Sequence, residues 1–339
     1  MSDTERHDAT SGDVEHHELD LEGADLDSVV EPVASGPTDP WDGFTGWEST
    51  GSASDVVETP FRRFRRRFLT RKPALVALGF IVVVILIAIF APLVAPYDPL
   101  DQDLRNTLQG PSGSHLLGTD ELGRDVLSRM IFGTRVSLLA ALQAVGIAIL
   151  LGVPPGLLAG YFGGWVDTLI SRINDTVMSF PPLLLAIAIV GVFGPNLRNA
   201  MLAVGIIFAP RFLRLMRASV LAVKEETFIE ASRSIGTGTA RILRTRVLPN
   251  SLSPMVVQVS LSLGFAMLAE ASLSFLGLGV QPPEASWGAM VGRAYRFLDQ
   301  SPTLVLFPGV AIVLAVLAFN VLGDGLRDSV GREVRGGGE

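Results

Sequence analysis

The chain has 339 residues, of which 48% are hydrophobic and only 18% are charged. A soluble protein of this length typically carries about a quarter charged residues, so the composition argues against a soluble domain and indicates an integral membrane protein. The absence of cysteine excludes disulfides, thiolate metal ligands and a cysteine nucleophile.

The net charge of −7 is distributed unevenly along the chain. Residues 1–59 contain 16 Asp or Glu against the single basic residue Arg6, whereas the remainder carries 26 Lys or Arg against 18 Asp or Glu. A segment so acidic and so poor in apolar clusters cannot fold alone, which predicts that residues 1–59 are a disordered cytoplasmic tail. His7, His16 and His17 lie in this tail, but histidines without a scaffold are weak evidence for metal binding, and no metal site is predicted.

Six apolar stretches in the rest of the chain are candidate transmembrane helices. They are residues 74–95, 136–159, 176–193, 200–210, 255–279 and 304–322. Four of them are uncharged and long enough to cross about 30 Å of hydrocarbon. Residues 200–210 are short and precede three arginines, and residues 255–279 contain Glu270. The prediction is an all-α, polytopic membrane protein with about six transmembrane helices, in which an N-terminal accessory helix precedes a core of five.

The basic residues predict the orientation of these spans. Residues 60–96 hold a cluster of seven Arg or Lys directly before the first span, and six crossings place 19 basic residues on that side against seven on the other. Cytoplasmic loops carry the excess of Lys and Arg, so both termini are predicted to be cytoplasmic. The cluster could instead bind nucleic acid, but its position against an apolar span favours a membrane anchor.

Residues 97–135 are predicted to lie on the outer side and to contain an amphipathic helix at the membrane interface. Its apolar stripe is Leu122, Val126, Leu127, Met130 and Ile131, and its polar face is Arg124, Asp125, Ser128 and Arg129. An apolar stripe is usually a buried face. Packing against neighbouring spans is therefore favoured over the alternative, a docking surface for an external solute-binding protein.

Within the predicted core at residues 136–323, the cytoplasmic loop 224–249 has the pattern of two short helices. Phe228, Ala231 and Ile235 recur at helical spacing and give the first helix an apolar face. Charged residues surround this face: Glu226, Glu230 and Arg233. An apolar face rimmed by charge on the cytoplasmic side indicates docking into a groove of a soluble partner.

The boundaries of the two short helices are also predicted. Gly236 is suited to end the first helix in a left-handed conformation. Thr237 or Thr239 can cap the second helix, which is expected to run to Val247 and to be broken by Pro249 before the fifth span.

Glu270 is the only ionisable residue predicted to lie well inside a span. A carboxylate there is costly and normally faces a bundle interior or a wet cavity. Three alternatives stay open: Glu270 lines the substrate path, pairs with a basic group of a partner subunit, or makes a structural hydrogen bond, as a carboxylate or as a protonated acid. After the last span, residues 324–339 are predicted to be a cytoplasmic tail.

The cytoplasmic loop 224–249 resembles the Glu-Ala-Ala loop of binding-protein-dependent ABC importer permeases. Glu230, Ala231, Gly236, Leu248 and Pro249 match that pattern, and Ser232 replaces its second Ala at a position that must stay small. Three more stretches are similar to dipeptide, oligopeptide and nickel permeases of the C type: residues 118–135, 271–288 and 319–328. Four motifs in order make the resemblance specific, and it covers roughly residues 60–330.

The resemblance implies that this chain is the pore subunit of an ATP-driven importer in the cell membrane of a prokaryote. It implies an ATPase-coupling loop formed by Glu226, Phe228, Glu230, Ala231, Ser232, Ile235, Gly236, Leu248 and Pro249. The implied partners are a second permease subunit, two ATPase subunits that bind ATP and Mg, and an extracytoplasmic solute-binding protein. No cofactor is expected in this chain. Peptides are the most frequent cargo of such permeases, and nickel and sugars are alternatives.

Two other classes of protein fit the sequence less well. An enzyme is disfavoured because His115 is the only histidine outside the tail and no zinc motif is present. A secondary transporter or channel, working without an ATPase, would typically show paired broken spans and several charges at mid-membrane. The coupling-type loop instead indicates a separate motor. This chain is not that motor, because its only lysines, Lys72 and Lys224, do not lie in phosphate-binding loops.

Overall fold

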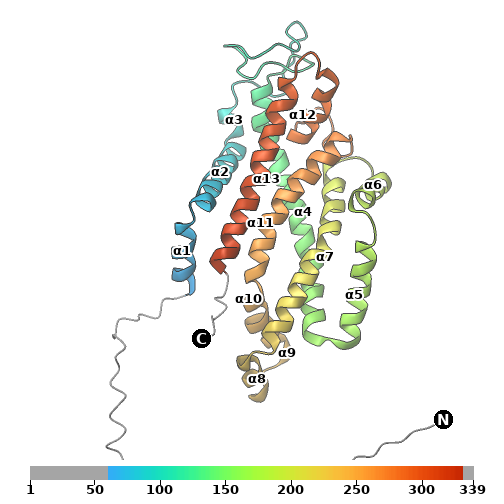
Figure 1. Cartoon of the computed structure of the whole chain (residues 1–339). Coiled ribbons are helices and arrows are strands. Elements are labelled where there is room, and N and C mark those ends of the chain that lie inside the picture. Colours follow the sequence, from blue (N-terminus) through green and yellow to red (C-terminus); the bar gives the residue numbers. More distant parts are fainter. Residues whose placement is uncertain (1–59, 331–339) are drawn as a thin grey trace, which may run out of the picture. The chain divides into compact units, whose positions relative to one another are not determined.

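Apolar segments that enter a bilayer must satisfy their own backbone hydrogen bonds, and in the computed structural model they do so as helices. The structure describes residues 60–330, a range that contains no β-strand (Figure 1). In chain order the helices are α1 (Pro60–Thr70), α2 (Lys72–Ile89), α3 (Ala91–Val94), α4 (Val126–Phe162), α5 (Gly164–Met178), α6 (Pro182–Phe193), α7 (Leu197–Lys224), α8 (Thr227–Ser234), α9 (Thr239–Ile242), the π-helix η3 (Leu243–Val247), α10 (Leu248–Ser251), α11 (Ser253–Phe275), α12 (Trp287–Ala294), the 3₁₀-helix η4 (Tyr295–Phe297) and α13 (Thr303–Val330).

Four described helices, α2, α4, α11 and α13, are long and apolar enough to cross a membrane, and the bent pair α5 and α6 raises the number to five. The helix α7 is not among them, although its 28 residues run along α4; it carries three arginines in its second half. Together these elements correspond to the six predicted stretches. The predicted class, an all-helical polytopic membrane protein, is confirmed.

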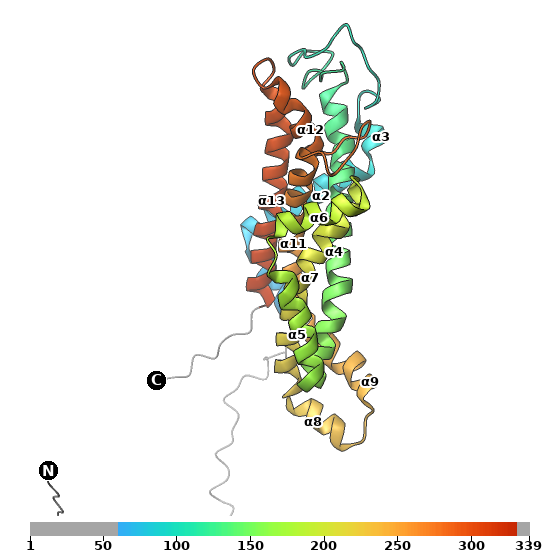
Figure 2. The same ribbon diagram turned by 90° about the vertical axis from the view of Figure 1, so that its right-hand side faces the viewer.

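The two ends of the bundle differ. Residues 95–125 and α12 lie at one end, here named the α12 end (Figure 1). The short helices α8 and α9 lie at the opposite end, near the turn that joins α4 to α5, and this is named the α8 end (Figures 1 and 2).

The closest helix packing joins α4 to α7, and glycines make it possible. Gly152, Gly156 and Gly160 recur every four residues on α4 and face the backbone of α7. A Cβ atom at Gly156 would lie 2.6 Å from the carbonyl oxygen of Leu213. Small residues at this spacing let two helices approach closely where lipid gives no hydrophobic driving force. We therefore expect α4 and α7 to behave as one rigid pair.

The third predicted span, residues 176–193, is not a continuous helix. The helix α5 ends at Met178, α6 starts at Pro182, and their axes differ by 90°. Pro181 adopts an extended ψ of 125°. Proline cannot donate a backbone hydrogen bond, and it disfavours helical backbone in the residue before it, so Pro181 and Pro182 break the helix.

The predicted amphipathic helix on the outer side is wrong in two respects. Residues from Val126 onward are the first turns of α4, whose 37 residues span about 55 Å, and Leu122 lies in the turn before it. The predicted polar face is buried, because Arg124, Asp125 and Arg129 are at most 3% exposed. Each of them has a partner inside the protein: Arg124 and Arg129 pair with Asp120, and Asp125 contacts His115. Val126 packs with Met290 and Leu304, in line with the favoured packing alternative.

The first and last spans pack against each other. The helix α2 ends at Ile89, earlier than the predicted end at residue 95, and Pro92 follows in the short helix α3. The helix α13 continues to Val330, so part of the predicted C-terminal tail is helical. Gly325 leaves room for Ala74, and Arg71 forms an exposed ion pair with Asp328 at 3.2 Å. The predicted acidic tail, residues 1–59, lies outside the described residues.

Candidate functional site

The helix α8, at the centre of the predicted coupling loop, is ended by a backbone motif that the sequence requires. Gly236 has a φ of +75°, which glycine adopts without strain. The N–H of Gly236 donates to the carbonyl of Arg233 at 2.9 Å, and the N–H of Thr237 donates to the carbonyl of Ser232 at 3.0 Å. These two bonds define a Schellman motif. The predicted left-handed glycine is confirmed.

The two faces of α8 have different surroundings. Ile229 is fully buried and Ser232 is 2% exposed, and the Ser232 hydroxyl donates to the carbonyl of Phe228 at 2.5 Å. On the other side, Phe228 is 37% exposed and Ile235 is 77% exposed, and Ala231 lies between them, exposed as well. Glu230, in the first turn, is also exposed, and Glu226 is the N-cap residue. The predicted apolar face is therefore open to an external partner.

The second short helix departs from its prediction. Neither predicted threonine caps it: Gly238 is the N-cap residue of α9, without a side-chain cap. Pro249 does not break the helix, which passes through the π-turn η3 and the short α10 to Ser251. The break comes at Leu252, between α10 and α11.

Several contacts join this loop to the long helices. Ile229, Ile242 and Val247 are at most 1% exposed and belong to the main apolar core, and Leu248 packs against it. The Arg233 guanidinium lies 5.5 Å from the ring centroid of Tyr161, near the end of α4. A cation–π contact of this kind contributes about 0.5–1 kcal/mol at an exposed site. The loop therefore contacts the bundle in two ways, through its buried apolar residues and through Arg233.

Ion pairs join α5 to α7 near the same end. The Arg217 guanidinium donates twice to Asp167, from Nε at 2.5 Å and from Nη2 at 2.6 Å. One helical turn earlier, Arg214 Nη2 donates to Asp175 at 2.8 Å. Two parallel bonds from one guanidinium to one carboxylate fix both distance and orientation.

A groove of about 620 Å³ opens between α7, α11 and α13 toward the α8 end. Its wall mixes apolar and polar side chains, including Ser219, Asn250, Gln258 and Arg327. Leu215 and Leu261 line the end of the groove that is farther from α8. One turn beyond them, the Arg211 guanidinium lies 5.7 Å from the Phe208 ring and 5.8 Å from the Phe265 ring.

Glu270 is buried at 1% exposure and accepts hydrogen bonds from three serines on three structural elements. Ser274 of α11 and Ser286, the N-cap of α12, each donate at 2.7 Å, and Ser137 of α4 donates at 3.2 Å. Each hydroxyl also accepts one backbone N–H, from Val280, Ala289 and Trp287 respectively. Among the alternatives for Glu270, this geometry corresponds to the structural hydrogen bond.

The residues that anchor the loop to the bundle, Ile229 and Tyr161, are not among the predicted site residues. Ile229 does not belong to the predicted apolar face. The one local signal for its burial is its spacing: it lies three positions before the small Ser232, so both residues are on the same side of a helix. Tyr161 carries no local signal, because its partner Arg233 is 72 positions away. Within residues 60–330, no group of three His, Asp or Glu side chains is placed to hold a metal ion.

Comparison with known protein families gives two matches that together cover most of the described chain. The family of binding-protein-dependent transport system inner membrane components matches residues 152–336. The N-terminal TM domain of oligopeptide transport permease C matches residues 59–111. The chain belongs to the family of binding-protein-dependent transport system inner membrane components, and the predicted membership among ABC importer permeases is confirmed.

Individual proteins and one solved structure are also similar to this chain. The dipeptide transport system permease protein DppC of Alkalihalophilus pseudofirmus is 46% identical over 272 residues, which cover 80% of this chain and 90% of that protein. The glutathione transport system permease protein GsiD is 46% identical in Pectobacterium atrosepticum, covering 81% of this chain and 91% of that protein. A chain of the MetNI methionine ABC transporter in an inward-facing conformation is 20% identical, with a TM-score of 0.49, over 61% of this chain and 98% of that chain.

Proposed function

We propose that this chain forms half of the passage of an ATP-driven importer of short peptides, and that α8 docks it onto a separate ATPase. The observation that carries this proposal is the division of α8 into two faces. Ile229 and Ser232 hold the helix in the bundle, while Phe228, Ala231 and Ile235 stay open at its end. An apolar helix face rimmed by charge suits a groove on a soluble partner. ATP and Mg are bound by that partner.

The packing supports a route by which a movement of the ATPase would reach the passage. A displacement of α8 acts on α4 through the Arg233–Tyr161 contact and on the core through Ile229. Because glycines bring α4 and α7 into backbone contact, the two helices would move as one body. In this proposal the α8 end and both termini are cytoplasmic, a second permease completes the passage, and a solute-binding protein delivers cargo at the α12 end.

The groove beside α7 and α11 is the proposed inner part of the passage. It holds polar side chains on helices that otherwise carry long apolar runs. Arg211 extends this face to the middle of α7, where its side chain is exposed in the single chain. A guanidinium facing lipid at that depth is costly, so a wet passage is its better environment.

Short peptides are the proposed cargo because the relatives carry dipeptides and glutathione, which both contain free carboxylates. A guanidinium on the passage wall would attract such a group electrostatically. Replacing Arg211 with Gln should therefore lower the uptake of a dipeptide more than the uptake of the same dipeptide with an amidated C-terminus. An equal loss of uptake for both peptides would show that Arg211 does not recognise the C-terminal carboxylate.

Docking is tested by copurification of the ATPase with the permease from solubilised membranes. Ile235→Arg places a charge on the exposed face without disturbing the core, because Ile235 is 77% exposed. The matched control is Leu104→Arg, at a residue that is 69% exposed in the segment at the α12 end. The proposal predicts that the ATPase is lost with Ile235→Arg and retained with Leu104→Arg. Retention in both variants would contradict docking through this face.

The passage is tested by cysteine labelling, for which the natural chain without cysteine is a ready background. Thiolates react in water, so Ser219→Cys and Gln258→Cys in the groove should react with a membrane-impermeant thiol reagent applied from the α8 side. Val313→Cys, on the exposed apolar surface of α13, is the control and should react slowly. Equally slow labelling at all three positions would place the groove in lipid.

A further inference from the structure

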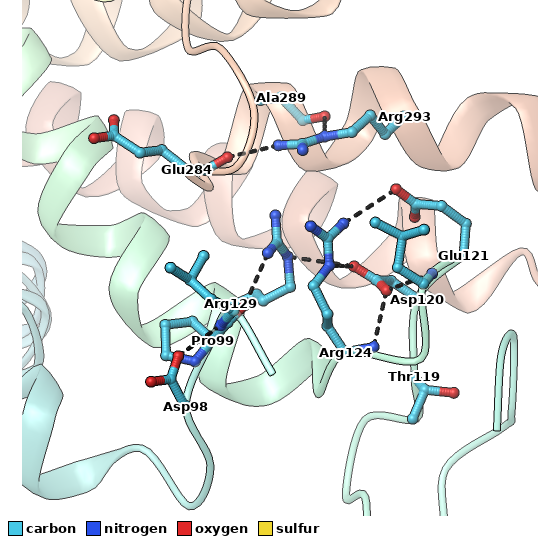
Figure 3. Close-up of polar contacts among 12 residues, drawn as sticks. Asp98, Pro99, Thr119, Asp120, Glu121, Arg124, Arg129, Glu284, Ala289 and Arg293 are labelled. Atoms are coloured by element: carbon cyan, nitrogen blue, oxygen red, sulfur yellow. Dashed lines mark hydrogen bonds and ion pairs between the residues drawn. The ribbon is translucent and has the colours of Figure 1, made fainter. Parts of the chain in front are cut away.

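Charged side chains gather inside the protein at the α12 end, where the segment before α4 meets α12 (Figure 3). Asp120 and Arg124 come from that segment, Arg129 from the first turn of α4, and Arg293 from α12. The side chains of Arg124 and Arg129 are 3% and 2% exposed, and that of Asp120 is 10% exposed. Charges so deeply buried are costly unless each has a counter-charge and hydrogen bonds.

The two carboxylates of this cluster are largely engaged by Arg124. Asp120 Oδ2 accepts from Arg124 Nε at 2.7 Å and lies 3.4 Å from Arg129 Nε. Asp120 Oδ1 accepts the backbone N–H groups of Leu122 and Arg124. Glu121 accepts from Arg124 Nη2 at 3.2 Å. The carboxylate of Glu284 points away from the cluster (Figure 3).

The remaining guanidinium groups find mainly neutral acceptors. Arg129 Nη1 donates to the carbonyl of Pro99 at 2.9 Å, and Arg293 donates to the carbonyls of Ala289 and Glu284. Within the part of the chain that the structure describes, Arg129 Nη2 is buried and has no hydrogen-bond partner. Three guanidinium groups therefore share two carboxylates, so the cluster carries one positive charge in excess, and Arg293 is half-buried. Burial, followed by the positive charge of Arg124, lowers the pKa of Arg293.

A small cavity lies between these three arginines. Its volume is about 20 Å³, and Asp120, Glu121, Val126, Met290, Ala294 and Leu304 complete its lining. A cavity needs roughly 10–15 Å³ by this measure to hold one water molecule, so the space fits one occupant of that size. We propose that this cavity binds a single small anion of the size of chloride.

The charge and the size of the cavity together favour this occupant. A water molecule could accept from Arg129 Nη2, but it would leave the excess positive charge uncompensated. A carboxylate or a phosphate would supply charge but has several heavy atoms, and only one of them would fit the space of about 20 Å³. Halide in this position would tie α12 to the start of α4 and to the segment before it. The site thus stabilises the α12 end and is independent of the proposed docking at α8.

The experiment is thermal unfolding of the purified full-length protein in chloride and in gluconate, a much larger anion, at equal ionic strength. The wild type should show a midpoint that rises with chloride and saturates, and bromide should reproduce the rise. Arg293→Gln balances the cluster at two charges of each sign. Its midpoint in gluconate should equal or exceed that of the wild type, and it should not respond to chloride. Arg296→Gln, at an exposed residue on η4, is the matched control and should keep the full response.

Two results would overturn the proposal. Equal midpoints of the wild type in chloride and gluconate would mean that water fills the cavity. A chloride response retained in both Arg293→Gln and Arg129→Gln would place the anion elsewhere. A merely structural role of Arg293 would lower the midpoint of Arg293→Gln by the same amount in both salts, with the response intact. Bromide anomalous diffraction should place one peak between the three guanidinium groups.

Discussion

Replacing Gly156 with Ala should destabilise the protein, although alanine is the better helix former. A Cβ atom at this position would lie 2.6 Å from the Leu213 carbonyl oxygen and 2.9 Å from Met216 Cβ. The helices α4 and α7 would have to separate by at least 0.4 Å to reach 3.0 Å at the first contact. Such overpacking typically costs about 1–3 kcal/mol, and a gap of about 0.5 Å already weakens dispersion between neighbouring side chains.

The same helix provides a matched control. Gly146 also lies within α4, but a Cβ atom there meets no atom within 4 Å. Gly146→Ala should therefore be neutral or stabilising by up to about 1 kcal/mol, from helix propensity alone. Thermal unfolding in detergent, followed by size-exclusion chromatography, compares the two variants. Relative to the wild type, we expect a lower unfolding midpoint for Gly156→Ala and an equal or higher midpoint for Gly146→Ala. Equal midpoints in both variants would refute the close packing of α4 on α7.

Three further predictions follow from single contacts. Glu270→Gln should keep the complex assembled, because the amide oxygen still accepts from two serines. Glu270→Ala should lose about 3 kcal/mol or more of stability. Similar losses of stability in both variants would show that the charge of Glu270 has a role. In a double-mutant cycle, Arg217→Gln and Asp167→Asn should show a coupling energy of about 0.5–2 kcal/mol in unfolding experiments, and additive effects would mean that their two hydrogen bonds contribute nothing. Gly236→Ala should weaken copurification of the ATPase, because the φ of +75° at this position is strained for any residue except glycine. Gly238→Ala, at a φ of −62°, should not weaken it. Equal ATPase binding by both variants would show that the turn at Gly236 is unimportant for docking.

Features encoded within a few residues could be predicted from the sequence. Gly236 at the end of α8 is such a case, since a left-handed residue after a short amphipathic helix is a local requirement. The long apolar runs predicted the helices of the bundle for the same reason. The break at Pro181 and Pro182 was also visible in the sequence, but hydropathy alone does not register it, because prolines do not interrupt an apolar run.

Features that depend on distant residues could not be predicted. Arg124 and Arg129 have the pattern of a solvated helix face, yet both are buried, and Arg129 donates to the carbonyl of Pro99, which lies 30 positions earlier. The role of Ser137 at Glu270 depends on a contact across 133 positions. Ile229 could be assigned to the core only once the position of α7 was known. Burial of a polar group is decided by its partners, which a local pattern does not contain.

We propose that this chain moves solute only when an ATPase is docked on α8. The most direct measurement is the uptake of a labelled dipeptide into liposomes that contain the complete complex, with ATP supplied on the α8 side. We expect uptake that requires ATP and is abolished by Ile235→Arg, while Leu104→Arg transports normally. Uptake by this chain without ATP or an ATPase would contradict the account and identify a secondary transporter or channel.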